Sequence, residues 1–165
     1  GEQQVLYTIL PLIMCMLGAF ASLIGVQAIF ESSPEVLFVS SHQMPLYPGS
    51  GHPSETGVGN VLNLPLAAGV DSSAFRAAVE RHWLPALDGF APQMILISAG
   101  FDAHAEDEMG QLRLREPDYA WVTTQLRELA ESHAEGRIVS LLEGGYALSA
   151  LGRSAGAHID ALLGH

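Results

Sequence analysis

Short apolar runs alternate with amphipathic segments of helix length, and this alternation limits the fold more than any other feature of the sequence. The runs are bounded by Gly, Pro and polar residues, as is typical of buried strands. They cover residues 36–41, 60–64, 94–99 and 138–142. Strands joined by helix-length crossovers run parallel. The sequence therefore predicts an α/β domain, a parallel sheet with helices on both faces.

Three helices are predicted between and after these strands. The first starts at Asp71 or Ser72, either of which can cap it, and runs to about residue 87. Its apolar stripe recurs at helical spacing. The stripe consists of Phe75, Val79, Trp83 and Leu87. Pro85 should kink or end this helix. The second helix opens around Pro117 and is terminated by Gly136, and the third covers 148–163.

The ends of the last two strands carry polar residues that could perform chemistry. In an open parallel sheet, ligands bind just past the carboxyl ends of the strands. The run 95–104 ends in Asp102, with His104, Glu106 and Asp107 close by. Such a cluster could hold a metal ion, or it could be a solvated acidic loop. From spacing alone, both interpretations stay open.

Two further candidates stand beside strand ends. Tyr146 follows Gly144 and Gly145 after the strand 138–142. Its hydroxyl could donate a hydrogen bond to a developing oxyanion, or the ring could simply pack over the glycine turn. His42 follows the strand 36–41, where a hydrogen-bonded structural histidine is the simpler interpretation. The sequence shows no Ser-His-Asp or Cys-His pairing.

The charge balance excludes one class of partner. The chain has 7 Lys and Arg against 18 Asp and Glu, a formal net charge of −11. Phosphate binding needs clustered cations, so we expect no nucleic-acid partner. An acidic surface suits a cationic substrate, although it also serves solubility. Cys15 is the only cysteine, so no internal disulfide can form.

The amino-terminal part of the sequence differs from the rest. Residues 5–30 contain no charged side chain, and 5–24 are long enough to cross a bilayer as a helix. No Lys or Arg precedes this run, as one would in a signal peptide. A membrane span, a buried helix or strand, and a segment that does not belong to the domain all remain open. We expect a cytoplasmic protein, membrane-associated if the apolar segment serves as an anchor.

Four motifs, taken together, resemble the zinc-dependent histone deacetylase family. They are 98–104 (SAGFDAH), 142–146 (LEGGY), 47–51 (YPGSG) and the stretch 111–123. The closest likeness is to bacterial members, including acetoin-utilisation and acetylpolyamine amidohydrolase proteins, and it covers 25 to about 164. The resemblance implies the arginase-deacetylase fold without its N-terminal part. It also implies that zinc-activated water cleaves an N-acetyl amide, such as acetyl-lysine or an acetylpolyamine.

The resemblance assigns roles residue by residue. Asp102 matches a zinc ligand, and Tyr146 matches the tyrosine that hydrogen-bonds the tetrahedral oxyanion. Tyr47 and Gly145 match the tunnel that surrounds the acyl-lysine stem. Two further groups match positions that bind structural monovalent cations, such as potassium. The first group is Phe30, Ser33 and Val36, and the second is Ser40 and Ser41.

One departure from the family pattern bears on activity. The family carries Asp-x-His-His-Gly-Asn-Gly-Thr just before the run that matches 27–30, which places two zinc ligands at positions 19 and 21. This sequence has Ala19 and Ala21 there, and the family's earlier tandem histidines are absent. A catalytic zinc normally has three protein ligands. We therefore expect an inactive fragment of a deacetylase, with 1–24 unrelated to the family domain of 25–165.

Two other interpretations remain. The chain could be a catalytically dead, deacetylase-like binding module, tethered to a membrane through 5–24. It could also be a nucleotide-binding α/β protein, but 57–59 (GVG) lacks the rest of a phosphate-binding loop. The oligomeric state cannot be inferred from the sequence.

Overall fold

The computed structural model describes residues 12–17, 22–46 and 49–165. A five-stranded sheet forms its centre, in the order β3-β2-β1-β4-β5, and every neighbouring pair is parallel. The strands are β1 (Leu12–Leu17), β2 (Val36–Gln43), β3 (Val61–Leu66), β4 (Met94–Gly100) and β5 (Ile138–Gly144). This arrangement confirms the predicted parallel α/β architecture.

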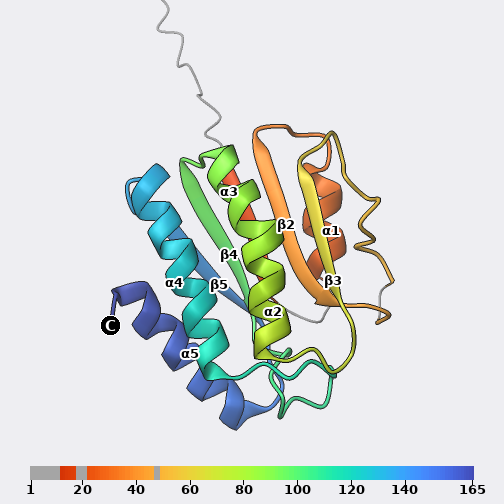
Figure 1. Cartoon of the computed structure of the whole chain (residues 1–165), viewed down its shortest axis with the longest axis vertical. Coiled ribbons are helices and arrows are strands. Elements are labelled where there is room, and N and C mark those ends of the chain that lie inside the picture. The colour runs from red at the N-terminus through yellow and green to blue at the C-terminus, as the bar shows by residue number, and fades with distance from the viewer. Residues whose placement is uncertain (1–11, 18–21, 47–48) are drawn as a thin grey trace, which may run out of the picture.

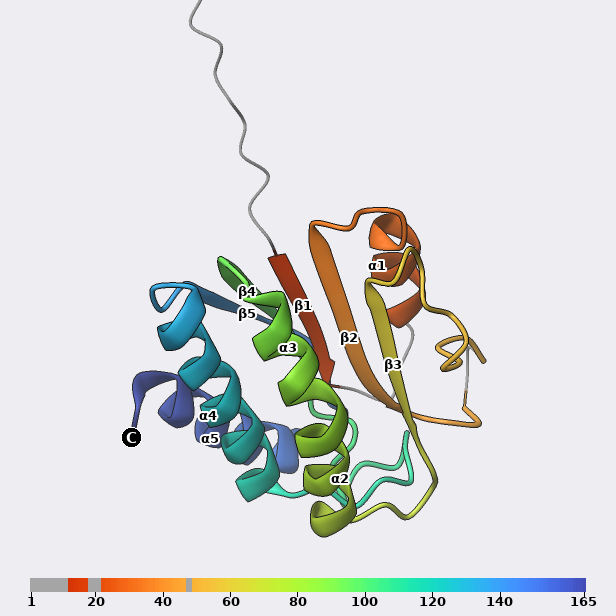
Figure 2. The same cartoon turned by 45° about the horizontal axis from the view of Figure 1, so that its top comes forward.

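Helices cover both faces of the sheet, but unequally (Figures 1 and 2). The single helix α1 lies behind β2 and β3, and the other helices lie on the opposite face. The helical segments are α1 (Ser22–Phe30), α2 (Ser72–Ala78), the π-helical turn η1 (Val79–Trp83), α3 (Leu84–Phe90), α4 (Glu116–His133) and α5 (Leu148–Leu163). The face that carries α2, η1, α3, α4 and α5, here termed the larger face, therefore holds the main core.

The two faces have separate apolar cores. Ile95, Ile97 and Ala99 of β4 are buried among the helices of the larger face. Phe38 and Val61 are buried on the α1 side, where the smaller core forms. Alternate residues of one strand point to opposite faces, so a fully apolar strand serves both cores at once.

The predicted helix that starts at residue 71 exists, but it does not end at Pro85. Asp71 caps it, accepting a hydrogen bond from the Ala74 amide (3.0 Å). The chain then passes through η1 into α3, with Pro85 in the first turn of α3, and ends at Ala91 in a left-handed conformation. A π turn changes the local hydrogen-bonding pattern, so a proline can follow it without breaking the helix. The predicted stripe of Phe75, Val79, Trp83 and Leu87 is fully buried, as expected.

The apolar segment 5–24 contains a central strand. Leu12–Leu17 form β1, which pairs with β2 from Leu12↔Val36 onward and with β4 from Leu12↔Met94 onward. These six residues follow the buried-strand alternative for this segment, and the assignment of 1–24 as a whole outside the family domain stays a prediction. A sequence without charged residues is typical of a central strand in a parallel sheet. Among the described residues, no helix combines the length and apolarity that a membrane crossing requires.

A buried histidine ties α5 to α4 and β5. His158 Nδ1 lies 2.6 Å from Thr123 Oγ1, and its Nε2 lies 2.8 Å from Ser140 Oγ. The Thr123 hydroxyl donates its hydrogen to the Tyr119 carbonyl (2.6 Å), so Nδ1–H acts as the donor to Thr123. Burial lowers the pKa of His158 below its ordinary value of 6.5. The network therefore holds a neutral imidazole.

We expect the unfolding free energy to fall as the pH drops from 6.5 to about 5, because His158 and the likewise buried His42 take up protons more readily when unfolded. Stability is complete above 6.5 and declines below it. The lowered pKa values of Glu55 and Glu116 act only below 4.5, outside this window. Urea titrations at several pH values should show a shallower decline for His158→Gln. The exposed control His82→Gln should decline like the parent, and equal slopes for all three proteins would contradict the assignment.

Candidate active site at the ends of β4 and β5

Asp102 lies where β4 ends, and a glycine of β5 makes room for it. Its side chain is 1% exposed. A Cβ atom at Gly144 would lie 3.2 Å from Asp102 Oδ2, and the Phe101 amide donates to the Gly144 carbonyl (2.9 Å). The motif Glu-Gly-Gly-Tyr thus brings the end of β5 against the carboxylate. The sequence placed polar residues after two neighbouring strands, and in the structure the ends of these strands, β4 and β5, lie against each other.

The next glycine turns the chain toward Tyr146. Gly145 has φ of +131°, a conformation that other residues rarely adopt. A Cβ there would also lie 2.9 Å from Leu151 Cδ1 and 3.1 Å from Phe101 Cβ. Tyr146 follows this turn and is 54% exposed. Its exposure at the sheet edge fits a residue that meets a ligand.

Asp107 holds this turn in place, a role that the sequence did not reveal. Its Oδ2 accepts hydrogen bonds from the Tyr146 amide (2.7 Å) and the Ala147 amide (3.1 Å), and its Oδ1 accepts one from the Met109 amide (3.0 Å). Asp107 is buried. Charge-assisted hydrogen bonds to the two amides just before α5 are strong, so Asp107 fixes the segment that leads into α5 and with it the backbone of Tyr146.

The other acidic neighbours of Asp102 are paired with cations. His104 is buried and stacks on Tyr119, with ring centroids 6.5 Å apart. Its Nδ1 accepts from the Glu106 amide (3.1 Å), and its Nε2 lies 3.5 Å from Glu116 Oε1. Arg153 of α5 bonds both Glu106 and Glu116, and it holds the pKa of Glu116 at about 2. The cluster is therefore a structural ion network rather than a free acidic loop.

The described residues do not by themselves fit a zinc centre. Within 12–17, 22–46 and 49–165, no three His, Cys, Asp or Glu side chains gather in a way that could hold a metal ion. Asp102 supplies one carboxylate where a catalytic zinc normally has three protein ligands. β1 ends at Leu17, paired with Ser41 and Ala99, so the chain reaches this same edge just before positions 19 and 21. Ala19, Ala21 and Tyr47 lie outside the described residues.

The first predicted cation group comes together around a side chain. The backbone carbonyls of Phe30, Ser33 and Val36 lie 2.8, 2.9 and 2.9 Å from Asn60 Nδ2. The resemblance brought these three carbonyls to attention, but nothing in the sequence marked Asn60. The three carbonyls converge on an amide nitrogen, and their role in binding a cation stays a prediction.

The second predicted cation group lies on β2. Ser40 and Ser41 are buried, and the Ser40 hydroxyl lies 3.1 Å from His42 Nδ1. His42 Nε2 donates to the Gly51 carbonyl (3.1 Å), so Nδ1 is the acceptor for Ser40. Burial lowers the pKa of His42. His42 is therefore a neutral structural histidine that ties β2 to the loop after residue 48.

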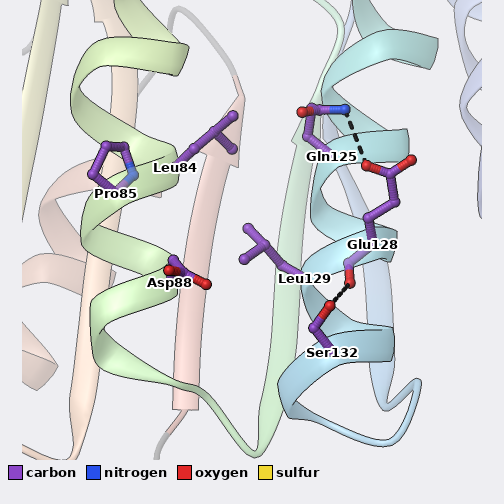
Figure 3. Close-up of a pocket in the computed structure, with 7 residues that line it drawn as sticks. All are labelled: Leu84, Pro85, Asp88, Gln125, Glu128, Leu129 and Ser132. Atoms are coloured by element: carbon purple, nitrogen blue, oxygen red, sulfur yellow. Dashed lines mark hydrogen bonds between the residues drawn. The ribbon is translucent and has the colours of Figure 1, made fainter.

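An open groove lies between α3 and α4 (Figure 3). It is lined by Leu84, Pro85, Asp88, Gln125, Glu128, Leu129 and Ser132. Two of its polar groups bond within α4, Gln125 to Glu128 (3.4 Å) and Ser132 to the Glu128 carbonyl (2.9 Å). Both helices lead from here into the amino ends of the next strands. The groove thus lies away from the edge that carries Asp102 and Tyr146.

Comparison with known proteins identifies the family. The family model described as "Histone deacetylase domain" matches residues 25–162. A "Probable deacetylase" of Archaeoglobus fulgidus is 41% identical over 128 residues, which are 75% of this chain and 36% of that protein. A "Histone deacetylase-like amidohydrolase" of Pseudomonas aeruginosa is 40% identical over 127 residues, 74% of this chain and 33% of that protein. The chain thus spans about a third of the length of these curated relatives.

Solved structures extend the likeness upstream of the family model. The HDA15 HD domain superposes with a TM-score of 0.86 at 32% identity, over 93% of this chain and 44% of that one. The histone deacetylase Clr3 superposes with a TM-score of 0.85 at 31% identity, over 98% of this chain and 28% of that one. At such coverage the match continues upstream of residue 25, into the region of β1. This protein, which carries part of a deacetylase fold, belongs to the histone deacetylase family.

Proposed function

We propose that this chain is one portion of a zinc-dependent deacetylase domain, which hydrolyses N-acetyl amides such as acetyl-lysine or acetylpolyamines. The observation that carries the proposal is the pairing of β4 with β5. That pairing places the buried carboxylate of Asp102 beside the glycine turn that presents Tyr146. In this proposal Asp102 supplies one metal ligand, and Tyr146 donates a hydrogen bond to the oxyanion.

The open edge of the sheet supports the interpretation as a portion of a larger domain. Among the described strands, β5 pairs only with β4. Leu141 and Leu142 of β5 are 57% and 65% exposed, and Val139 is exposed as well. An apolar edge strand of this kind invites pairing with further chain. We propose that this edge receives the part of the fold that relatives possess and this chain lacks.

A catalytically dead binding module is the second candidate, and Ala19 and Ala21 at the ligand positions favour it. Its membrane tether through 5–24 is weakened by the structure, because Leu12–Leu17 cannot both form the central strand and cross a bilayer. The net charge of −11 suits a cationic partner such as a polyamine or a lysine-rich peptide in either case.

We expect the isolated chain to show no zinc-dependent turnover of acetyl-lysine peptides or acetylpolyamines, because the described residues supply one ligand where three are needed. The measurement is amine release with and without added zinc and chelator, together with zinc stoichiometry after dialysis. The Archaeoglobus protein described as a "Probable deacetylase" is assayed in parallel as the full-length reference. Turnover that disappears on chelation would show that the site is complete and would overturn the fragment interpretation. Saturable substrate binding without turnover would favour the binding module.

A further inference from the structure

Asn60 lies at the junction of three elements. It precedes β3 directly, and it is 4% exposed. Its Nδ2 contacts the Phe30 carbonyl at the end of α1, the Ser33 carbonyl in the following turn and the Val36 carbonyl at the start of β2. A single nitrogen therefore connects the carboxyl end of α1 to the beginnings of two strands.

The orientation of the carboxamide is set by its other atom. Asn60 Oδ1 accepts a hydrogen bond from the Val58 amide (3.1 Å), which can only donate. The NH₂ group must then face the carbonyls. Gly57 permits this packing, because a Cβ there would lie 2.5 Å from the Glu31 carbonyl oxygen and 2.6 Å from Asn60 Oδ1.

Three converging carbonyl oxygens concentrate negative partial charge around Asn60 Nδ2. The Phe30 carbonyl belongs to the last turn of α1, where the partial negative charge of the helix gathers. Nδ2 carries two hydrogens for three oxygens at 2.8–2.9 Å, so at least one contact is shared. The arrangement resembles the oxygen shell of an ion, with an amide nitrogen at its centre.

We propose that the carboxamide of Asn60 substitutes for a monovalent cation at this junction. The resemblance to deacetylases implies a structural cation held by these same three carbonyls, and here their common centre is occupied by Nδ2. Ion and amide cannot both lie within hydrogen-bond distance of the same three oxygens. The junction of α1, β2 and β3 is therefore held together by a side chain of the protein and needs no bound cation. This holds whether or not the domain hydrolyses amides.

The first test compares thermal unfolding of the whole chain in potassium, sodium and choline chloride at equal ionic strength. Equal melting temperatures in the three salts are expected. A saturable rise in potassium or sodium over choline would show that a cation binds the chain, and a potassium-dependent shift of the Asn60 side-chain NH₂ signals would place that cation at the junction and overturn the proposal.

The second test is Asn60→Asp, which keeps the shape of the side chain and removes both hydrogens. We expect the melting temperature in choline at neutral pH to fall by about 10 °C, because a buried carboxylate would face three carbonyls. Potassium or sodium should then restore part of the loss, since the pocket now consists only of oxygen. The matched control is Asn63→Asp, a buried asparagine inside β3, which should show no such cation dependence.

Two outcomes of the second test would overturn the proposal: unchanged stability of Asn60→Asp in choline, or an equal response to cations in the Asn63→Asp control. If Asn60→Asp does not fold, nuclear magnetic resonance of the wild type decides. The side-chain NH₂ signals of Asn60 should be protected from hydrogen exchange and unaffected by potassium. Rapid exchange, or a shift that saturates with potassium, would contradict the assignment.

Discussion

Replacing Cys15 with proline should destabilise the chain by about 3 kcal/mol or more, because proline removes a backbone donor from the middle of a sheet. Cys15 stands at the centre of β1, opposite Val39 of β2 and Ile97 of β4. β1 is thus hydrogen-bonded on both sides and has no free edge to tolerate the change. Loss of its pairing would separate β2 and β3 from β4 and β5.

The control is Cys15→Ala, which keeps the backbone N–H at the same position. Urea unfolding followed by circular dichroism should show a much lower midpoint for Cys15→Pro than for Cys15→Ala, or no folded state at all. Similar midpoints would mean that residues 12–17 are dispensable to the sheet. The interpretation of 5–24 as an anchor outside the domain would then return.

Four of the five strands could be predicted from the sequence because each is an apolar run with clear boundaries. The predicted run 36–41 became β2, which continues to Gln43 through polar residues. The run 138–142 became β5, which continues to Gly144. Backbone pairing extends past the last apolar residue at these carboxyl ends, where polar residues and glycine continue the strands.

β1 could not be assigned because its sequence suits several environments. An uncharged run is expected of a central parallel strand, a buried helix and a membrane span alike. The choice depends on partners distant in the sequence, here Val36–Gln43 and Met94–Gly100. The familiar motifs begin only after this strand, so the resemblance gave no guidance for it.

The sequence could indicate those residues of the site that belong to recognisable side-chain motifs. It could not indicate those that act through hydrogen bonds to backbone groups. Asp102 and Tyr146 follow two strands that pair with each other, so the sequence could place them at one edge. Asp107 acts by accepting from backbone amides, and Asn60 acts by donating to backbone carbonyls. Such roles leave no pattern of side-chain types along the chain. They become visible only once the fold brings distant backbone groups together.

A restored domain should separate the roles of Asp102 and Tyr146. It would carry Ala19→Asp and Ala21→His, and the upstream portion of the Archaeoglobus relative would be joined ahead of the present chain. In that protein, Asp102→Ala should abolish stoichiometric zinc, because it removes one of three ligands. Tyr146→Phe should retain zinc and KM but lower kcat by about 10²–10³, or roughly 3–4 kcal/mol, because it removes a hydrogen bond made mainly in the transition state.

The matched control is Tyr119→Phe, which removes a buried hydroxyl that donates to the Phe101 carbonyl (3.2 Å). It should lower stability and leave kcat near that of the restored parent, because this hydroxyl serves the packing of α4 on the end of β4. Steady-state kinetics and zinc analysis of the three variants distinguish the outcomes. A Tyr146→Phe variant with parental kcat would show that the Tyr146 hydroxyl takes no part in the reaction. Full zinc content in Asp102→Ala would place the metal away from the end of β4.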